Sequence, residues 1–400
     1  MPRVFPFEGL CYDPAVAGPL KLVTAPPYDV INDVRRQEFL AASEFSVVHL
    51  DLAEGSDDPA HPQSRYTRAA ELLAEWQRCG ALVRSSEASF WAYEMRLGPH
   101  AEAARIRGLL CAMELEEWGG SVIPHEHTMP GPVQDRLQLL RATRTHLSAV
   151  YGTIQGPCEP LTRLLDQASS VDTAFLVVDE QGVEHRMWEA PGGDPVATWL
   201  TDESLLIADG HHRYTTALHY RNERHAAQGP GPWDRLLAFI VDSGSEPVPV
   251  LPFHRLQMSG SIPSLGPSLG PSIGDRVGSL DDVLGALSDE GVVVGLASGS
   301  DGEVEYRVVH LSGEAPAVRA LHLEVLDRSA PAGSLRYLPD AHDADDAVRR
   351  GEAVAAWFLP PTTPDRIRKV VERGERLPQK STYFWPKPRT GMIMMPLDPM

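Results

Sequence analysis

The residues best suited to chemistry form one run of five: Asp209, Gly210, His211, His212 and Arg213. The run follows an apolar stretch over 205–208, which predicts a buried strand, and precedes a helical pattern over 211–227. We expect Asp209 to be the N-cap and Gly210 to let the backbone turn sharply or approach a ligand. The positive end of a helix favours anions, and Arg213 adds a planar donor suited to phosphate. The alternative is that the histidines pack or cap and that Asp-Gly is only a turn.

A second polar group lies upstream and consists of His125, Glu126, His127, Asp135 and Arg136. Phosphoryl transfer needs donors for the phosphates, acidic groups for Mg²⁺ and a carboxylate that orients the attacking hydroxyl. Glu126 is the candidate base, Asp209 is the candidate metal-facing carboxylate, and both are candidate Mg²⁺ ligands. Arg136 and Arg213 are candidates for neutralising charge on the transferred group. Taken alone, the upstream segment is also typical of a polar loop near a helix N-cap.

The elements that must position these groups alternate between strand and helix. Apolar runs over 174–179 and 236–242 predict strands, and 133–147 has helical periodicity. Alternation of this kind predicts a mixed α/β sheet. We divide the chain into an N-terminal α/β region (1–118), a catalytic core (119–256), a flexible linker with a repeated Pro-Ser-Leu-Gly unit (257–280) and a C-terminal α/β region (281–400).

Near the end of the chain, residues 380–387 (KSTYFWPK) bring two lysines, two hydroxyl groups and three aromatic rings together. Lys380 and Lys387 are candidates for closing over nucleotide phosphates, with Ser381 and Thr382 assisting. The alternative is a solvated tail whose aromatic side chains pack on the core.

Composition limits the classes of function. The chain has 400 residues and a formal net charge of −19, which disfavours a nucleic-acid partner because such proteins usually carry a basic surface. No apolar run approaches the length of a membrane span, and the first residues lack the apolar core of a signal peptide. The four cysteines are scattered without a CxxC pair, so they suggest neither a disulfide framework nor a zinc site. We expect a cytoplasmic protein.

Five segments together resemble successive motifs of one bacterial family, catalogued as domain of unknown function 1015: RVFPFEGL (3–10), APPYDVI (25–31), HEHT (125–128) with Asp135-Arg136, ADGHHRY (208–214) and KSTYFWPK (380–387). The ADGHHRY segment is in turn similar to one in the ParB/sulfiredoxin superfamily, particularly in the free-serine kinases. This resemblance implies a ParB/sulfiredoxin-like core with N- and C-terminal elaborations. It also implies phosphorylation of L-serine from ADP or ATP with Mg²⁺.

The resemblance implies roles for individual residues. Glu126 would be the base, Asp209 would work with the metal, and phosphate would be held by His211, His212 and Arg213. The candidate catalytic residues are therefore Glu126, Asp209 and His212. The candidate nucleotide-binding residues are Gly210, His211, His212, Arg213, Arg136, Lys380, Ser381 and Thr382.

Two other functions remain open from the sequence. One is a nucleotide-binding regulator, by analogy with the DNA-partitioning members of the superfamily. The other is a metal-dependent hydrolase with ligands among His125, His127, His211 and His212. The expected partners are a nucleotide and a small-molecule substrate, without nucleic acid or membrane. A homo-oligomer is an open alternative.

Overall fold

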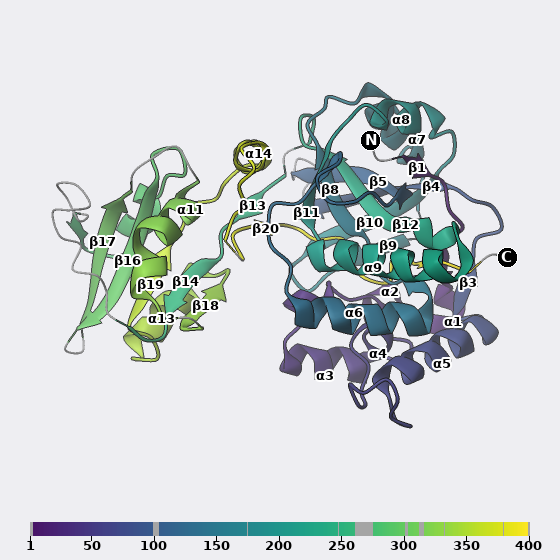
Figure 1. Ribbon diagram of the computed structural model, residues 1–400, viewed down its shortest axis with the longest axis horizontal. Coiled ribbons are helices and arrows are strands. Elements are labelled where there is room, and N and C mark those ends of the chain that lie inside the picture. The colour runs from purple at the N-terminus through teal and green to yellow at the C-terminus, as the bar shows by residue number, and fades with distance from the viewer. Residues whose placement is uncertain are drawn as a thin grey trace. The chain divides into compact units, whose positions relative to one another are not determined.

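The computed structural model describes residues 3–98, 104–173, 175–246, 248–260, 275–300, 303–311, 316–331, 333–378 and 380–398. The chain forms two compact units (Figure 1). The first unit contains residues 1–124, 128–247 and 386–400, and the second contains 125–127 and 248–385. The first unit thus combines residues from the regions 1–118 and 119–256 of the sequence-based division. Most of the predicted linker, 261–274, lies outside the described residues.

The first unit is built on a nine-stranded mixed sheet in the order β6-β11-β8-β12-β5-β4-β10-β9, with β1 also paired to β5. Its strands are β1 (Val4–Phe5), β4 (Phe90–Leu97), β5 (Arg105–Glu114), β6 (Val122–Ile123), β8 (Val150–Ile154), β9 (Phe175–Val178), β10 (Val183–Ala190), β11 (Leu205–Asp209) and β12 (Arg235–Asp242). β12 is parallel to β8 and antiparallel to β5. The central strands β5 and β12 are almost wholly buried, as expected for strands covered on both faces.

Helices surround this sheet. Residues of α7 (Glu159–Ala168), α8 (Asp194–Leu200) and α9 (His211–Gln228) share one apolar core with the central strands. α9 also packs on α6 (Pro130–Thr143), which packs on α5 (Arg65–Arg78), and α5 contacts α4 (Val48–Asp51) (Figure 1). Shorter elements complete the unit: α1 (Pro14–Ala17), α2 (Leu20–Val23), α3 (Asp33–Ala42), and the strand pairs β2 (Leu10–Tyr12) with β3 (Leu82–Arg84) and β7 (Thr145–His146) with β21 (Met395–Pro396).

The second unit has a six-stranded sheet in the order β15-β17-β16-β19-β14-β18. Its strands are β14 (His254–Gln257), β15 (Arg276–Val277), β16 (Val293–Ser300), β17 (Glu303–His310), β18 (Leu335–Leu338) and β19 (Ala355–Phe358). α10 (Leu280–Ala286) and α13 (Ala341–Arg349) bury their apolar sides on this sheet. The other elements are α11 (Ala317–Leu321), the π-helical turn η4 (His322–Leu326), α12 (Asp327–Ser329), α14 (Pro364–Glu372) and the pair β13 (Val250–Leu251) with β20 (Tyr383–Phe384).

The predicted mixed α/β class is confirmed, and the strand and helix that flank the 209–213 run occur where the sequence predicts them. The helix predicted over 133–147 ends earlier, at Thr143. Arg144 adopts left-handed backbone with φ 47°, and Thr145 and His146 then pair with β21 instead of continuing the helix. Among the described residues, no helix is long and apolar enough to cross a membrane.

Candidate functional site

The 209–213 run lies at the junction of β11 and α9. Gly210 is the N-cap, with φ 94° and ψ 27°, a conformation that residues with a side chain rarely adopt. A Cβ at this position would lie 3.1 Å from the guanidinium carbon of Arg213. The predicted sharp turn at Gly210 is confirmed, but the prediction that Asp209 caps α9 is wrong. Asp209 is the last residue of β11, paired with Tyr151 of β8, and its carboxylate has other partners.

The Asp209 carboxylate joins two cations. Arg213 Nη2 donates to Oδ2 at 2.6 Å, and the Lys387 ammonium donates to Oδ1. Lys387 also donates to Asp29 Oδ2 at 2.9 Å. The side chains of Asp209 and Lys387 are only 16% and 7% exposed, so these charge-assisted hydrogen bonds are stronger than they would be in water. Three motifs that are distant in sequence, APPYDVI, ADGHHRY and KSTYFWPK, therefore contribute to one ion-pair cluster.

Lys387 is a fixed positive charge in this cluster. Burial alone would lower the pKa of Lys387, because removal from water disfavours the ammonium. The nearby carboxylates of Asp209 and Asp29 outweigh burial and raise the pKa of Lys387 above its ordinary value. The Lys387 ammonium therefore stays charged at neutral pH.

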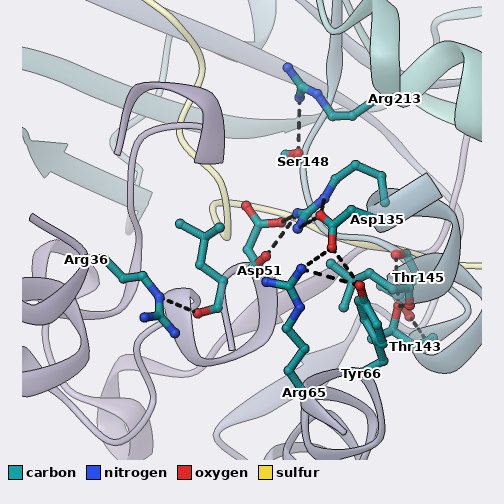
Figure 2. Close-up of polar contacts among 12 residues, drawn as sticks. Arg36, Asp51, Arg65, Tyr66, Asp135, Thr143, Thr145, Ser148 and Arg213 are labelled. Carbon is teal, nitrogen blue, oxygen red and sulfur yellow. Dashed lines mark hydrogen bonds and ion pairs between the residues drawn. The ribbon is translucent and has the colours of Figure 1, made fainter. Parts of the chain in front are cut away.

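Arg213 is held in place by the protein itself. Nη1 donates to the carbonyl oxygen of Ala149 and, at 3.1 Å, to Ser148 Oγ (Figure 2). Together with Asp209, these acceptors fix the direction of the guanidinium group. Arg213 thus brings positive charge to the first turn of α9, where the helix dipole also favours an anion.

Arg136 lies in a separate cluster of polar side chains. Figure 2 labels Asp51, Arg65, Tyr66 and Asp135 of this cluster. Arg136 Nη1 donates to Asp51 Oδ1 at 2.7 Å, and both Nε and Nη2 donate to Asp135 Oδ2. Its guanidinium carbon is 4.4 Å from the ring centre of Tyr28, close enough for a cation–π contact. Asp135 accepts further hydrogen bonds from Tyr66 and Arg65. All three guanidinium nitrogen atoms of Arg136 donate to protein acceptors.

Burial shifts the acid–base properties of the Arg136 cluster. It raises the pKa of Asp51, although the positive charge of Arg136 opposes the shift. Burial would also raise the pKa of Asp135, but Arg136 and Tyr66 outweigh it and lower that pKa. Burial raises the pKa of Tyr28 to about 12.

A small cavity touches both arginines. Its volume is about 50 Å³, enough for water-sized groups and too little for a nucleotide. It is lined by Tyr28, Asp51, Arg136, Leu139, Leu140, Thr145, His146, Leu147, Ser148, Val150, Arg213 and Thr216.

The two adjacent histidines have different environments. His211 is buried, with 7% of its surface exposed. The backbone N–H of Met129 donates to His212 Nε2 at 3.0 Å, so this nitrogen is an acceptor and the neutral ring carries its proton on Nδ1. This hydrogen bond ties the first turn of α9 to the segment that precedes α6.

Glu126 belongs to the second unit, together with the KST part of the C-terminal motif. Its Oε1 accepts from the backbone N–H of Ser381 at 3.1 Å and from Thr382 Oγ1 at 3.4 Å. The buried ring of His125 contacts the same hydroxyl group, with 2.7 Å between Nε2 and Thr382 Oγ1. The Glu126 side chain keeps 18% of its surface exposed, so it is both held in place and accessible.

The hydrogen bond between Lys380 and Arg255 is made by the backbone of Lys380. Its carbonyl oxygen accepts from Arg255 Nη1 at 2.8 Å, and its ammonium lies 5.5 Å from the ring centre of Phe253. Lys380 has φ 54°, in the left-handed region. These contacts belong to the second unit, whereas Lys387 belongs to the first.

A family model described as "Protein of unknown function (DUF1015)" matches residues 4–261. The chain belongs to the DUF1015 family. No curated protein matches it.

Several solved structures are similar to this DUF1015 protein. A free serine kinase variant in complex with AMP has 15% identity and a TM-score of 0.37, with 70% of this chain and 87% of the kinase covered. A variant in complex with ADP has 16% identity and a TM-score of 0.36, with 66% and 83% covered. SbnI from Staphylococcus aureus, with a C-terminal truncation, has 11% identity and a TM-score of 0.39, with 70% and 85% covered. At these identities and TM-scores, the similarities assign no activity or residue role to this chain.

The resemblance implies Mg²⁺, which prefers several oxygen ligands in an octahedral arrangement. Both oxygens of Asp209 already accept from cations, and the charges of Lys387 and Arg213 oppose a dication there. In the described parts of the chain, no group of three or more His, Cys, Asp or Glu side chains is arranged to hold a metal ion. The described residues therefore do not fit a Mg²⁺ held by the DUF1015 protein alone. The described residues likewise contain no ligand cluster of the kind that a metal-dependent hydrolase would need.

Asp51 and Arg255 were not assigned to the site from the sequence. They carry no local motif, and only their long-range contacts reveal them. Asp29 lies within APPYDVI, one of the motifs that carry the resemblance, and the structure adds its contact with Lys387.

Proposed function

We propose that this DUF1015 protein is a nucleotide-dependent kinase that phosphorylates a small hydroxyl metabolite, with free L-serine as the first acceptor to test. ATP and ADP are both candidate donors. In this proposal the nucleotide phosphates bind at the first turn of α9.

One observation carries the proposal. Asp29, Asp209 and Lys387 come from three different motifs, yet they form one ion-pair cluster beside the N-terminus of an 18-residue helix. The positive end of that helix favours a phosphate group, and Arg213 and Lys387 offset the negative charges of Asp209 and Asp29 there. Gly210 has no side chain, so phosphate oxygens can approach the backbone closely.

Glu126 is the candidate base of the proposed reaction. The acceptor hydroxyl attacks the terminal phosphorus atom, the bond from phosphorus to the leaving nucleotide oxygen breaks, and Glu126 accepts the hydroxyl proton. Hydrogen bonds from Ser381 and Thr382 hold the Glu126 carboxylate in place.

Phosphorus NMR of the purified protein with ATP or ADP, Mg²⁺ and L-serine tests the proposal. Glu126→Gln and Asp209→Asn should abolish the phosphoserine resonance while far-UV circular dichroism stays unchanged. Glu352→Gln and Asp398→Asn are matched controls, because these exposed carboxylates pair with Arg350 and Arg144 instead.

The outcomes separate the alternatives. Full turnover by both Glu126→Gln and Asp209→Asn would refute the assigned roles. Product with another hydroxyl compound, but not with serine, would keep the kinase and change its acceptor. Tight nucleotide binding without any phosphorylated product would favour the regulatory alternative.

A further inference from the structure

Arg255 is a fully buried arginine in the second unit. It lies on β14, where its register partners are Tyr337 on β18 and Trp357 on β19. Its guanidinium carbon is 4.9 Å from the ring centre of Tyr337. Burying a charge is unfavourable unless hydrogen bonds compensate for the lost water. The contacts of Arg255 therefore need a physical explanation.

The hydrogen bonds of Arg255 go largely to the backbone. Nη1 donates to the carbonyl oxygens of Phe253 at 2.6 Å and Lys380 at 2.8 Å. Nε donates to His322 Nε2 at 3.2 Å. Burial lowers the pKa of Arg255 to about 10, although the phenol of Tyr337 and the carboxylate of Glu126 oppose the shift. The guanidinium group therefore remains charged at neutral pH.

Arg255 holds a strained residue. Lys380 has φ 54°, which an L residue adopts only when its surroundings enforce it. The hydrogen bond from Arg255 fixes the carbonyl of this same residue. The next backbone N–H, from Ser381, then points to Glu126 Oε1, and the Thr382 hydroxyl follows.

We infer that Arg255 is a positioning residue for Glu126, acting through the left-handed backbone of Lys380. Its importance for catalysis rests on the proposed kinase function, but its effect on residues 380–382 does not. Arg255 sets the direction of the Ser381 N–H, which in turn holds the carboxylate.

Amide hydrogen exchange without nucleotide tests this inference. Arg255→Met should accelerate exchange of the Ser381 amide about tenfold while amides of β16 keep their wild-type rates. Arg255→Lys keeps the charge and one donor, so it should restore part of the protection. Arg349→Met is the matched control, because Arg349 lies in the same unit and bonds Asp345 and Tyr306 instead.

A second variant separates positioning from general destabilisation. Lys380→Gly relieves the backbone strain, since glycine adopts positive φ readily. Combined with Arg255→Met, it should recover much of the protection at Ser381. Wild-type exchange at Ser381 in a folded Arg255→Met protein would overturn the inference. The inference would also be overturned if the double variant exchanged the Ser381 amide as fast as Arg255→Met does, with β16 amides accelerated to the same extent. If Arg255→Met does not fold, Arg255→Lys and Lys380→Gly still test the link.

Kinetics extend the test once a product is found. If Arg255 positions the base, Arg255→Met should lower kcat by at least about tenfold and leave the KM for nucleotide near its wild-type value. An unchanged kcat with faster Ser381 exchange would refute the catalytic part alone. Absence of any product would refute the proposed function and leave the exchange result standing.

Discussion

Replacement of Arg136 by methionine should destabilise the first unit strongly. The change leaves Asp51, with 7% of its side chain exposed, without the guanidinium group that lies 2.7 Å away. Removing one partner of a buried pair costs about 3–5 kcal/mol, because an uncompensated charge stays buried. Loss of the contact with the Tyr28 ring adds about 0.5–2 kcal/mol. Asp135 is less affected, since it keeps Arg65 and Tyr66.

Urea denaturation followed by circular dichroism and tryptophan fluorescence measures this loss. Arg141→Met on the same helix is the matched control. Its partner Glu223 is 43% exposed, so the expected loss is below about 1 kcal/mol. In the double variant with Asp51→Asn both charges are gone, so the combined loss should be about 2 kcal/mol less than the sum of the single losses.

The pH dependence gives a second check. Without Arg136, the pKa of Asp51, which burial already raises, should rise further. A carboxyl group with a raised folded-state pKa contributes stability that is full below its unfolded value and is lost as the pH rises through the folded value. The Arg136→Met deficit should therefore be smaller at pH 4.5 than at pH 7.5. Equal deficits at both pH values, or fully additive single losses, would refute the reasoning. A loss of unfolding free energy in Arg136→Met no larger than that in Arg141→Met would also refute it.

Three further predictions concern other parts of the chain. Gly210→Ala should lower the free energy of unfolding by about 1–2 kcal/mol because of the positive φ, and by more because the new Cβ would contact Arg213. Gly80, with φ 78° and open space around it, is the control: Gly80→Ala should show only the backbone cost in the same denaturation assay. Lys387→Met should lose about 3 kcal/mol by leaving two carboxylates on one site, and an unchanged melting temperature would contradict this. Burial lowers the pKa of His254 from its usual 6.5 to about 4, so its stabilising effect is full above pH 6.5 and is lost as the pH falls towards 4. Between pH 7.5 and pH 5 the wild type should lose roughly 2 kcal/mol more than His254→Gln, and parallel losses would exclude this assignment.

Much of the site's local framework could be predicted from the sequence. The apolar run 205–208, the glycine after Asp209 and the helical pattern beyond it specify a strand, a sharp turn and a helix, and the structure has all three. These features depend on side-chain periodicity and on the φ angles open to glycine, which act over a few residues. The exact cap was harder to predict: the Asp209 side chain is held by Arg213 and Lys387, so Gly210 takes the N-cap position.

The pairing of charges was decided only by the tertiary structure. From the sequence, Arg136 is a candidate phosphate ligand, but Asp51 and Asp135 occupy its nitrogen atoms. Likewise, Lys380 and Lys387 look equivalent in one short motif, yet they belong to different units. Ion pairs between distant segments depend on which strands and helices become neighbours, and no short-range pattern encodes that choice. The sequence determined the elements and the types of charge that they carry, whereas the tertiary structure determined which charge each one meets.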